Sequence, residues 1–296
     1  MTSDALILDT ALAELATFLG SHEPERGGAL LGPRSINAIS HFVPDYYAPS
    51  YATSYTSSNE LVREVNALEA AEPIELKGIA HSHPGGLDRP SELDRQAAFE
   101  SLAANPNLPR YLMPIITLGT GPAVQPNELD LLWPTGDLDP VAAGLVSSFA
   151  AYRERGGSNV GLAPTQMRIQ PVGSSLAAAA ELLDASRIGF PRAVEYSGTP
   201  MLAANLTAVN GDEWDFMFPW SPLFAPMIFR DGEVITVDWD FDSPREERLA
   251  SSLEQHLQRE RKGLWRPALE AVKWAGVGAA VAYTLLLQRK PQRPRR

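Results

Sequence analysis

The chain has 296 residues, of which 44% are hydrophobic, so it can bury a core in one large domain or in two of ordinary size. Its formal net charge of -11 disfavours nucleic acid as a partner and suits polar or basic partners. The absence of cysteine excludes a disulfide framework, cysteine-based catalysis and thiol-dependent conjugation. Because Asp4, Asp9 and Glu14 interrupt the N-terminus, we predict no signal peptide and a cytoplasmic protein.

The N-terminal region alternates predicted helices and strands. Residues 5–19 carry apolar side chains at helical spacing and predict an amphipathic helix. The segment GGALLG, residues 27–32, is a short apolar strand whose glycines permit close backbone approach. Residues 36–58 predict a strand and then a long tyrosine-rich loop, which either forms a groove wall for an extended peptide or caps a core. A helix over residues 59–71 and a buried strand over residues 74–80 follow.

Two histidines extend the last of these strands. In a strand, residues two apart point to the same face, so His81 and His83 project together and Ser82 is turned away. After a turn rich in proline and glycine, Ser91 occupies the N-cap position of a predicted helix and Asp94 lies in its first turn. Two imidazoles and one carboxylate match the ligand count of a catalytic zinc site, which leaves a fourth position for water.

Each pair on its own has a simpler interpretation. A His-x-His pair in a strand is often incidental, and Ser91 with Asp94 alone indicates a capping box. A structural zinc site would be closed by four ligands and would normally include cysteine, which this chain lacks. The joint occurrence of all four residues across one strand-turn-helix junction favours an open metal site.

These residues resemble a known signature. His81-Ser82-His83-Pro84, six residues and then Ser91-x-x-Asp94 resemble the signature of the JAMM (JAB/MPN-plus) metalloproteases at every defining position. The upstream segment PERGGALLG, residues 24–32, resembles the stretch that carries the family's glutamate. The resemblance covers residues 1 to 140.

The resemblance implies roles for single residues. It assigns one Zn²⁺ per chain, with a metal-bound water, to three ligands, His81, His83 and Asp94. It implies that Glu25 acts as general base and then general acid, and that Ser91 donates a hydrogen bond to the oxyanion. Glu23 is the alternative base, but the Glu-x-Gly-Gly alignment favours Glu25.

The order of elements predicts an α/β or α+β fold. The resemblance implies a JAB/MPN, cytidine-deaminase-like α/β/α catalytic domain at residues 1–150. Further strands are predicted at residues 111–119 and 127–134. Residues 153–166 are rich in glycine and proline and predict a domain boundary. Beyond them, residues 167–262 predict an α+β accessory domain.

The accessory region contains a predicted hairpin that turns at Asp231-Gly232 and a predicted helix start with a capping box at Ser243-Pro244-Arg245-Glu246. Its order of elements loosely resembles an E2-like or RWD fold, without a catalytic cysteine, and an unrelated α+β domain is the alternative. Residues 266–296 predict an apolar helix with a basic tail. The uncharged run Trp274–Leu287 either contacts a membrane or docks on protein, and it is shorter than the roughly 17 to 25 residues of a spanning helix.

The family resemblance implies a function. It implies an isopeptidase or peptidase that cleaves after the C-terminal glycine of a ubiquitin-like protein, whether by deconjugation or precursor processing, in a bacterial conjugation system of a kind that includes antiviral ones. The partner is then the ubiquitin-like protein or its conjugates, with no nucleic acid. A protease for sulfur-carrier proteins and a non-catalytic MPN-minus scaffold are the alternatives. The sequence leaves the oligomeric state undetermined.

Overall fold

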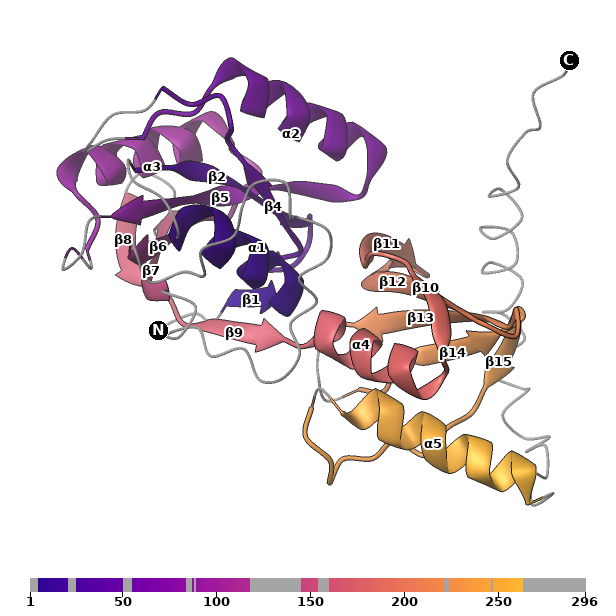
Figure 1. Cartoon of the computed structure of the whole chain (residues 1–296). Helices are drawn as coiled ribbons and strands as arrows, with labels where there is room; N and C mark the ends of the chain where they lie inside the picture. The colour runs from indigo at the N-terminus through magenta and orange to yellow at the C-terminus, as the bar shows by residue number, and fades with distance from the viewer. Residues whose placement is uncertain are drawn as a thin grey trace, which may run out of the picture.

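The computed structural model describes residues 5–20, 25–49, 55–83, 87, 89–117, 145–153, 160–220, 224–245 and 247–262. Within these residues the protein is a mixed α/β structure with five helices and three sheets. Figure 1 shows an N-terminal part, indigo to magenta, beside a C-terminal part, orange to yellow. The predicted strand at 127–134 and the predicted helix at 266–296 lie outside the described residues.

A six-stranded sheet forms the centre of the N-terminal part. Its order is β4 (His41–Pro44), β2 (Gly27–Pro33), β5 (Ile74–His83), β6 (Arg110–Thr117), β7 (Leu145–Arg153) and β8 (Val160–Pro164). Only β5 and β6 pair in parallel, and α3 (Glu92–Ala104) connects them. The predicted boundary at 153–166 falls inside this sheet, because β7 pairs with β8.

Helices cover both faces of this sheet (Figure 1). On one face, α2 (Asn59–Ala71) packs through Leu61 and Val65, and α3 packs through Ala98 and Leu102. On the other face, α1 (Asp9–Gly20) packs in a hydrophobic cluster that includes Leu30, Ala80 and Leu112 of the sheet. The predicted helix at 59–71 and the strands within 74–83 and 110–117 are confirmed.

The prediction of one amphipathic helix over residues 5–19 is wrong. Residues Ala5–Leu8 form strand β1, which lies between β3 (Ala38–Ile39) and β9 (Met167–Gln170) in a small parallel sheet. Both partners of β1 are distant in sequence, and the local spacing of apolar residues cannot reveal such pairing. The helix that follows is buried on nearly every side, since it is enclosed between the sheet and the C-terminal part.

The C-terminal part is a second sheet covered by two helices. Strands β10 (Ala185–Ile188), β12 (Thr199–Ala208), β13 (Glu213–Pro219), β14 (Met227–Arg230) and β15 (Glu233–Ile235) follow one another in space, and β11 (Arg192–Tyr196) also pairs with β12. Helices α4 (Val172–Leu182) and α5 (Arg248–Arg261) bury Leu176 and Leu249 in one cluster with Trp214 and Phe216 of the sheet.

Two local predictions in this part have different outcomes. The hairpin turn at Asp231-Gly232 is confirmed, and φ values of 50° and 85° at these residues fit a type I′ turn. The predicted capping box at 243–246 is wrong. The hydroxyl of Ser243 donates to Asp240 at 2.7 Å, and α5 begins at Arg248 after an uncapped Glu247. Ser243 therefore stabilises the loop before α5 and does not cap the helix, because a serine hydroxyl can bond to nearby loop groups instead.

No helix within the described residues is long and apolar enough to cross a membrane.

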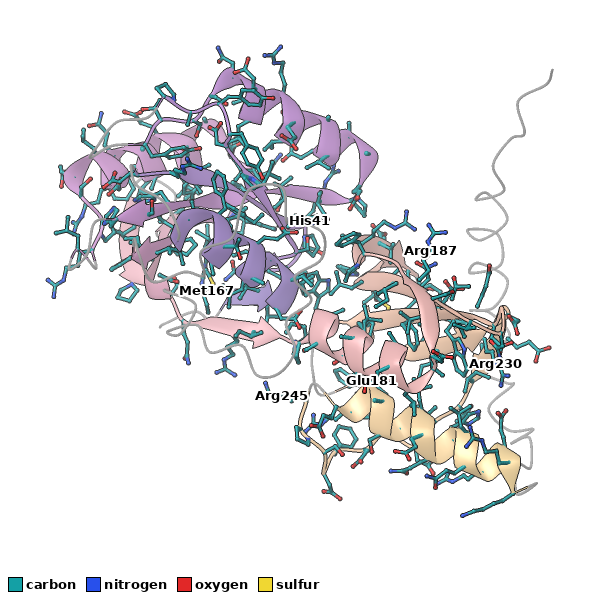
Figure 2. The ribbon with its side chains drawn as sticks, viewed as in Figure 1. His41, Met167, Glu181, Arg187, Arg230 and Arg245 are labelled. Carbon is teal, nitrogen blue, oxygen red and sulfur yellow. The ribbon has the colours of Figure 1, made fainter. Side chains whose placement is uncertain are left out.

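A buried carboxylate joins the two parts of the chain. Asp9, at the start of α1, accepts hydrogen bonds from the backbone N–H groups of Gly173 and Ser174 at 2.8 and 2.7 Å, and from the Ser174 hydroxyl at 2.8 Å. It thereby caps the N-terminus of α4 from a distant segment. Burial raises the pKa of Asp9, and these hydrogen bonds oppose that shift. Met167 marks the start of β9, the strand that leads into α4 (Figure 2).

Replacing Asp9 by Ala is expected to lower the free energy of unfolding by at least about 2 kcal/mol, because buried N–H donors lose their acceptor. Urea unfolding followed by tryptophan fluorescence, to which the buried Trp214 contributes, measures the change. The matched control is Glu181→Ala, which removes an exposed carboxylate from α4, the helix that Asp9 caps (Figure 2). Equal unfolding midpoints for the two variants would contradict a capping role.

Candidate functional site

Two histidines lie side by side at the end of β5. This strand lies between β2 and β6, and the side chains of His81 and His83 are 5% and 6% exposed. Their Nε2 atoms are 2.8 Å apart and their ring centroids 4.7 Å apart. The expected projection of both imidazoles from one face is therefore confirmed.

The first turn of α3 brings a carboxylate to the histidines. Asp94 places Oδ1 at 3.4 Å from Nε2 of His81, and Oδ2 at 3.4 Å from Nε2 of His83. The same residue completes a capping box, because the Asp94 N–H donates to Ser91 Oγ at 3.2 Å and the Ser91 N–H donates to Asp94 Oδ2 at 2.7 Å. The helix cap and the histidine contacts are thus compatible, and the cap orients the carboxylate.

The three side chains form a candidate metal-binding site. One ligand atom from each of His81, His83 and Asp94 lies within 4.8 Å of the others. Ligands in a tetrahedral zinc site, at about 2.0–2.1 Å from the metal, are about 3.3 Å apart. Both histidine–aspartate distances of 3.4 Å match that separation, and the histidine–histidine distance of 2.8 Å is shorter. Nitrogen and carboxylate donors suit zinc and other divalent metals.

The charges within this cluster are strongly coupled. Burial raises the pKa of Asp94, but hydrogen bonds with both histidines outweigh burial and hold that pKa well below its usual range. Burial lowers the pKa of His83, and the hydrogen bond and charge of Asp94 reverse this, so the net shift is upward. An anionic aspartate beside the two imidazoles is the arrangement that favours a bound cation.

Glu25 lies two residues before β2, the strand that pairs with the histidine strand β5. The register of β2 on β5 pairs Gly27 with His81, so the chain before Gly27 continues toward His83. Glu25 is 8% exposed, and burial raises its pKa. The charges of His83 and His81 lower this pKa, and the charge of Asp94 raises it. The alternative base, Glu23, lies outside the described residues.

The residue between the two histidines has a contact that its strand position does not reveal. Ser82 is fully buried, and its Oγ accepts a hydrogen bond from the backbone N–H of Arg26 at 2.9 Å. In return the Ser82 N–H donates to the Arg26 carbonyl at 2.9 Å. These two bonds extend the pairing of the strands beyond Gly27 and hold the residue next to Glu25. The only signal in the sequence is a serine in a buried strand, where its hydroxyl needs a partner.

Replacing Ser82 by Ala is expected to lower kcat about 10- to 100-fold, with little change in KM, for any reaction that uses Glu25, because the Glu25 segment loses a tether while the candidate metal ligands remain. Ser82→Thr keeps the hydroxyl and is expected to recover most of the rate. Steady-state kinetics, a zinc assay and the amide NMR signal of Arg26 test this together. Unchanged kcat in Ser82→Ala, or a loss of metal affinity in it, would contradict a positioning role.

An aromatic side chain lies against Gly27, the first residue of β2. A Cβ at Gly27 would lie 2.3 Å from the ring of Tyr55, so only glycine fits there. The Tyr55 hydroxyl donates to the buried carboxylate of Asp45 at 3.0 Å. By contrast, Tyr46 and Tyr47 are 53% and 68% exposed. The tyrosine-rich segment thus caps the sheet at Tyr55 and exposes the rings of Tyr46 and Tyr47.

Comparison with known proteins gives one family. Residues 9–130 match a family model described as prokaryotic homologs of the JAB domain. The matched region contains every residue of the cluster described above. No curated protein matches the chain. Among solved structures, the chain is similar to the solution structure of protein DSY2949 from Desulfitobacterium hafniense, at 16% identity, covering 56% of this chain and 93% of that chain, with a TM-score of 0.34. That likeness is too weak to support a statement about fold or function.

Proposed function

We propose that the protein, whose residues 9–130 match the model of prokaryotic homologs of the JAB domain, is a zinc-dependent hydrolase of amide bonds. The observation that carries the proposal is the convergence of two buried histidines and one aspartate on a single point, with the buried carboxylate of Glu25 beside them. Three protein ligands with an open fourth position are typical of catalytic zinc sites.

The residues around the site suit this chemistry. Bound zinc supplies a nucleophile at neutral pH by lowering the pKa of a water molecule. Glu25 accepts a proton and returns it to the leaving amine, and burial raises its pKa toward the range in which a carboxylate serves both steps. Ser91 is exposed at the cap of α3, beside Asp94, and in this proposal its hydroxyl donates a hydrogen bond to the oxyanion of a substrate.

The substrate class follows from the resemblance to the JAMM metalloproteases. We propose cleavage after the C-terminal glycine of a ubiquitin-like protein, in a bacterial conjugation system. Glycine tails lack side chains and can enter a narrow groove. The C-terminal part, with its own sheet and two helices, offers surface for a conjugate beyond the scissile bond, and a protease acting only on a small carrier protein would not need it.

Metal removal tests the proposal directly. A ubiquitin-like protein from a neighbouring gene, fused through its C-terminal glycine to a reporter, is incubated with the full chain before and after treatment with a chelator. Cleavage after glycine is expected to vanish with the chelator and to return when zinc is added. A chain that holds stoichiometric zinc without cleaving would indicate a scaffold, and a chain that binds no zinc would overturn the proposal.

A further inference from the structure

A cavity lies at the end of the six-stranded sheet opposite the histidines. Its volume is about 370 Å³. Because β5 and β6 run in parallel, their N-terminal ends share one sheet edge, and the antiparallel β2 brings its C-terminal end to that same edge by pairing Pro33 with Ile74. Lys77 in the cavity wall precedes His81 by four residues of strand, which spans about 13 Å. The cavity is therefore separate from the candidate metal site.

The lining of this cavity is cationic. Three of its side chains carry positive charge, namely Arg34, Lys77 and Arg110. None of the described lining residues is acidic, although the whole chain carries a net charge of -11. Cavities lined by one sign of charge focus the electrostatic potential and concentrate the opposite ion.

Two of the cations are held in place by the fold. The side chain of Lys77 is 5% exposed, and its Nζ lies 2.7 Å from Oε1 of Glu75. Arg34 donates from Nε to the Ile74 carbonyl at 3.2 Å and from Nη2 to the Glu69 carbonyl at 3.1 Å. These bonds use two of the five N–H donors of the guanidinium and restrict its motion. The carboxylate of Glu75 thus balances Lys77 alone, and the cavity keeps an excess of positive charge.

The remaining wall is apolar and comes from Ile36, Leu108 and Pro109. Small-molecule sites combine such apolar walls with a few fixed polar groups, and their volumes run from about 300 to 1,000 Å³. We propose that this cavity is a binding site for a small organic anion, in which a phosphate or carboxylate group faces the three cations and the carbon skeleton contacts the apolar wall. This proposal does not depend on hydrolase activity.

Calorimetric titration of the full chain tests the proposal with three probes: inorganic phosphate, a nucleoside monophosphate and citrate. Comparing the affinities of the nucleoside monophosphate and of citrate shows whether the cavity prefers a phosphate or a carboxylate group. Comparing the affinities of the nucleoside monophosphate and of inorganic phosphate shows whether contact with the apolar wall strengthens binding. We expect at least one organic probe to bind, and binding to weaken at least tenfold in both Lys77→Met and Arg110→Gln. Because Arg110 is only partly buried, its variant gives a result even if Lys77→Met folds poorly.

Two control variants distinguish binding in this cavity from binding at the protein surface or at the metal site. Arg63→Gln removes an exposed arginine on α2 and is expected to leave binding unchanged. His81→Ala removes a candidate metal ligand and is also expected to leave binding unchanged. Loss of binding in His81→Ala would place the anion at the metal instead. Absence of binding for every probe, or equal affinity in Arg110→Gln and the original chain, would likewise overturn the proposal.

Discussion

Replacing Glu25 by Gln is expected to reduce hydrolysis by about 10²- to 10⁴-fold, the usual contribution of a general acid–base group, while zinc remains bound. The reason is geometric. Glu25 lies beside the histidine cluster but comes from the segment before β2, whereas the three candidate ligands come from β5 and α3. Glutamine preserves the size of the side chain and removes its ability to accept a proton.

The rate of cleavage of the glycine-linked fusion and the zinc content of the purified variant measure the two effects separately. Glu92→Gln is the matched control, since it removes an exposed carboxylate from the first turn of α3 without altering the cluster. Retention of activity in Glu25→Gln would exclude this residue as the base. Loss of zinc along with activity would show that Glu25 is a ligand.

Replacing Asp94 by Ala is expected to lower zinc affinity by more than about 100-fold, since even residues that only support ligands have effects of 10- to 100-fold. Activity should fall with metal occupancy. Because the same carboxylate accepts from the Ser91 N–H, the variant should also lose about 1 kcal/mol of stability from the helix cap.

Ser91→Ala separates the effect of the helix cap on stability from the effect of Asp94 on zinc affinity. It removes the acceptor for the Asp94 N–H and costs a similar stability, but it leaves all three candidate ligands in place. We expect it to keep zinc and to lose activity about 100-fold or more, as for other oxyanion donors. Zinc competition against a chromophoric chelator and thermal unfolding provide the measurements. Equal zinc affinity in Asp94→Ala and Ser91→Ala would contradict ligation by the aspartate.

Most of the candidate site could be predicted from local sequence. His81 and His83 alternate with Ser82 within one strand, and Ser91 and Asp94 are three residues apart at a helix start, so local geometry determines how each pair projects. Their convergence depends on the short distance along the chain between β5 and α3. The place of Glu25 beside them depends instead on the register of β2 on β5, which joins segments more than fifty residues apart.

The sequence by itself therefore determined the metal-ligand pattern, the helix at 59–71 and the hairpin turn at Asp231-Gly232, because short-range sterics and capping decide these features. Only the tertiary structure decided that Ala5–Leu8 is a strand and that Ser82 holds the Arg26 backbone. It also decided that Asp9 caps α4 although 165 residues separate it from Ser174 in the sequence, and that three cations line one cavity. Each of these rests on pairing or burial between distant segments, for which a local window of sequence carries no signal.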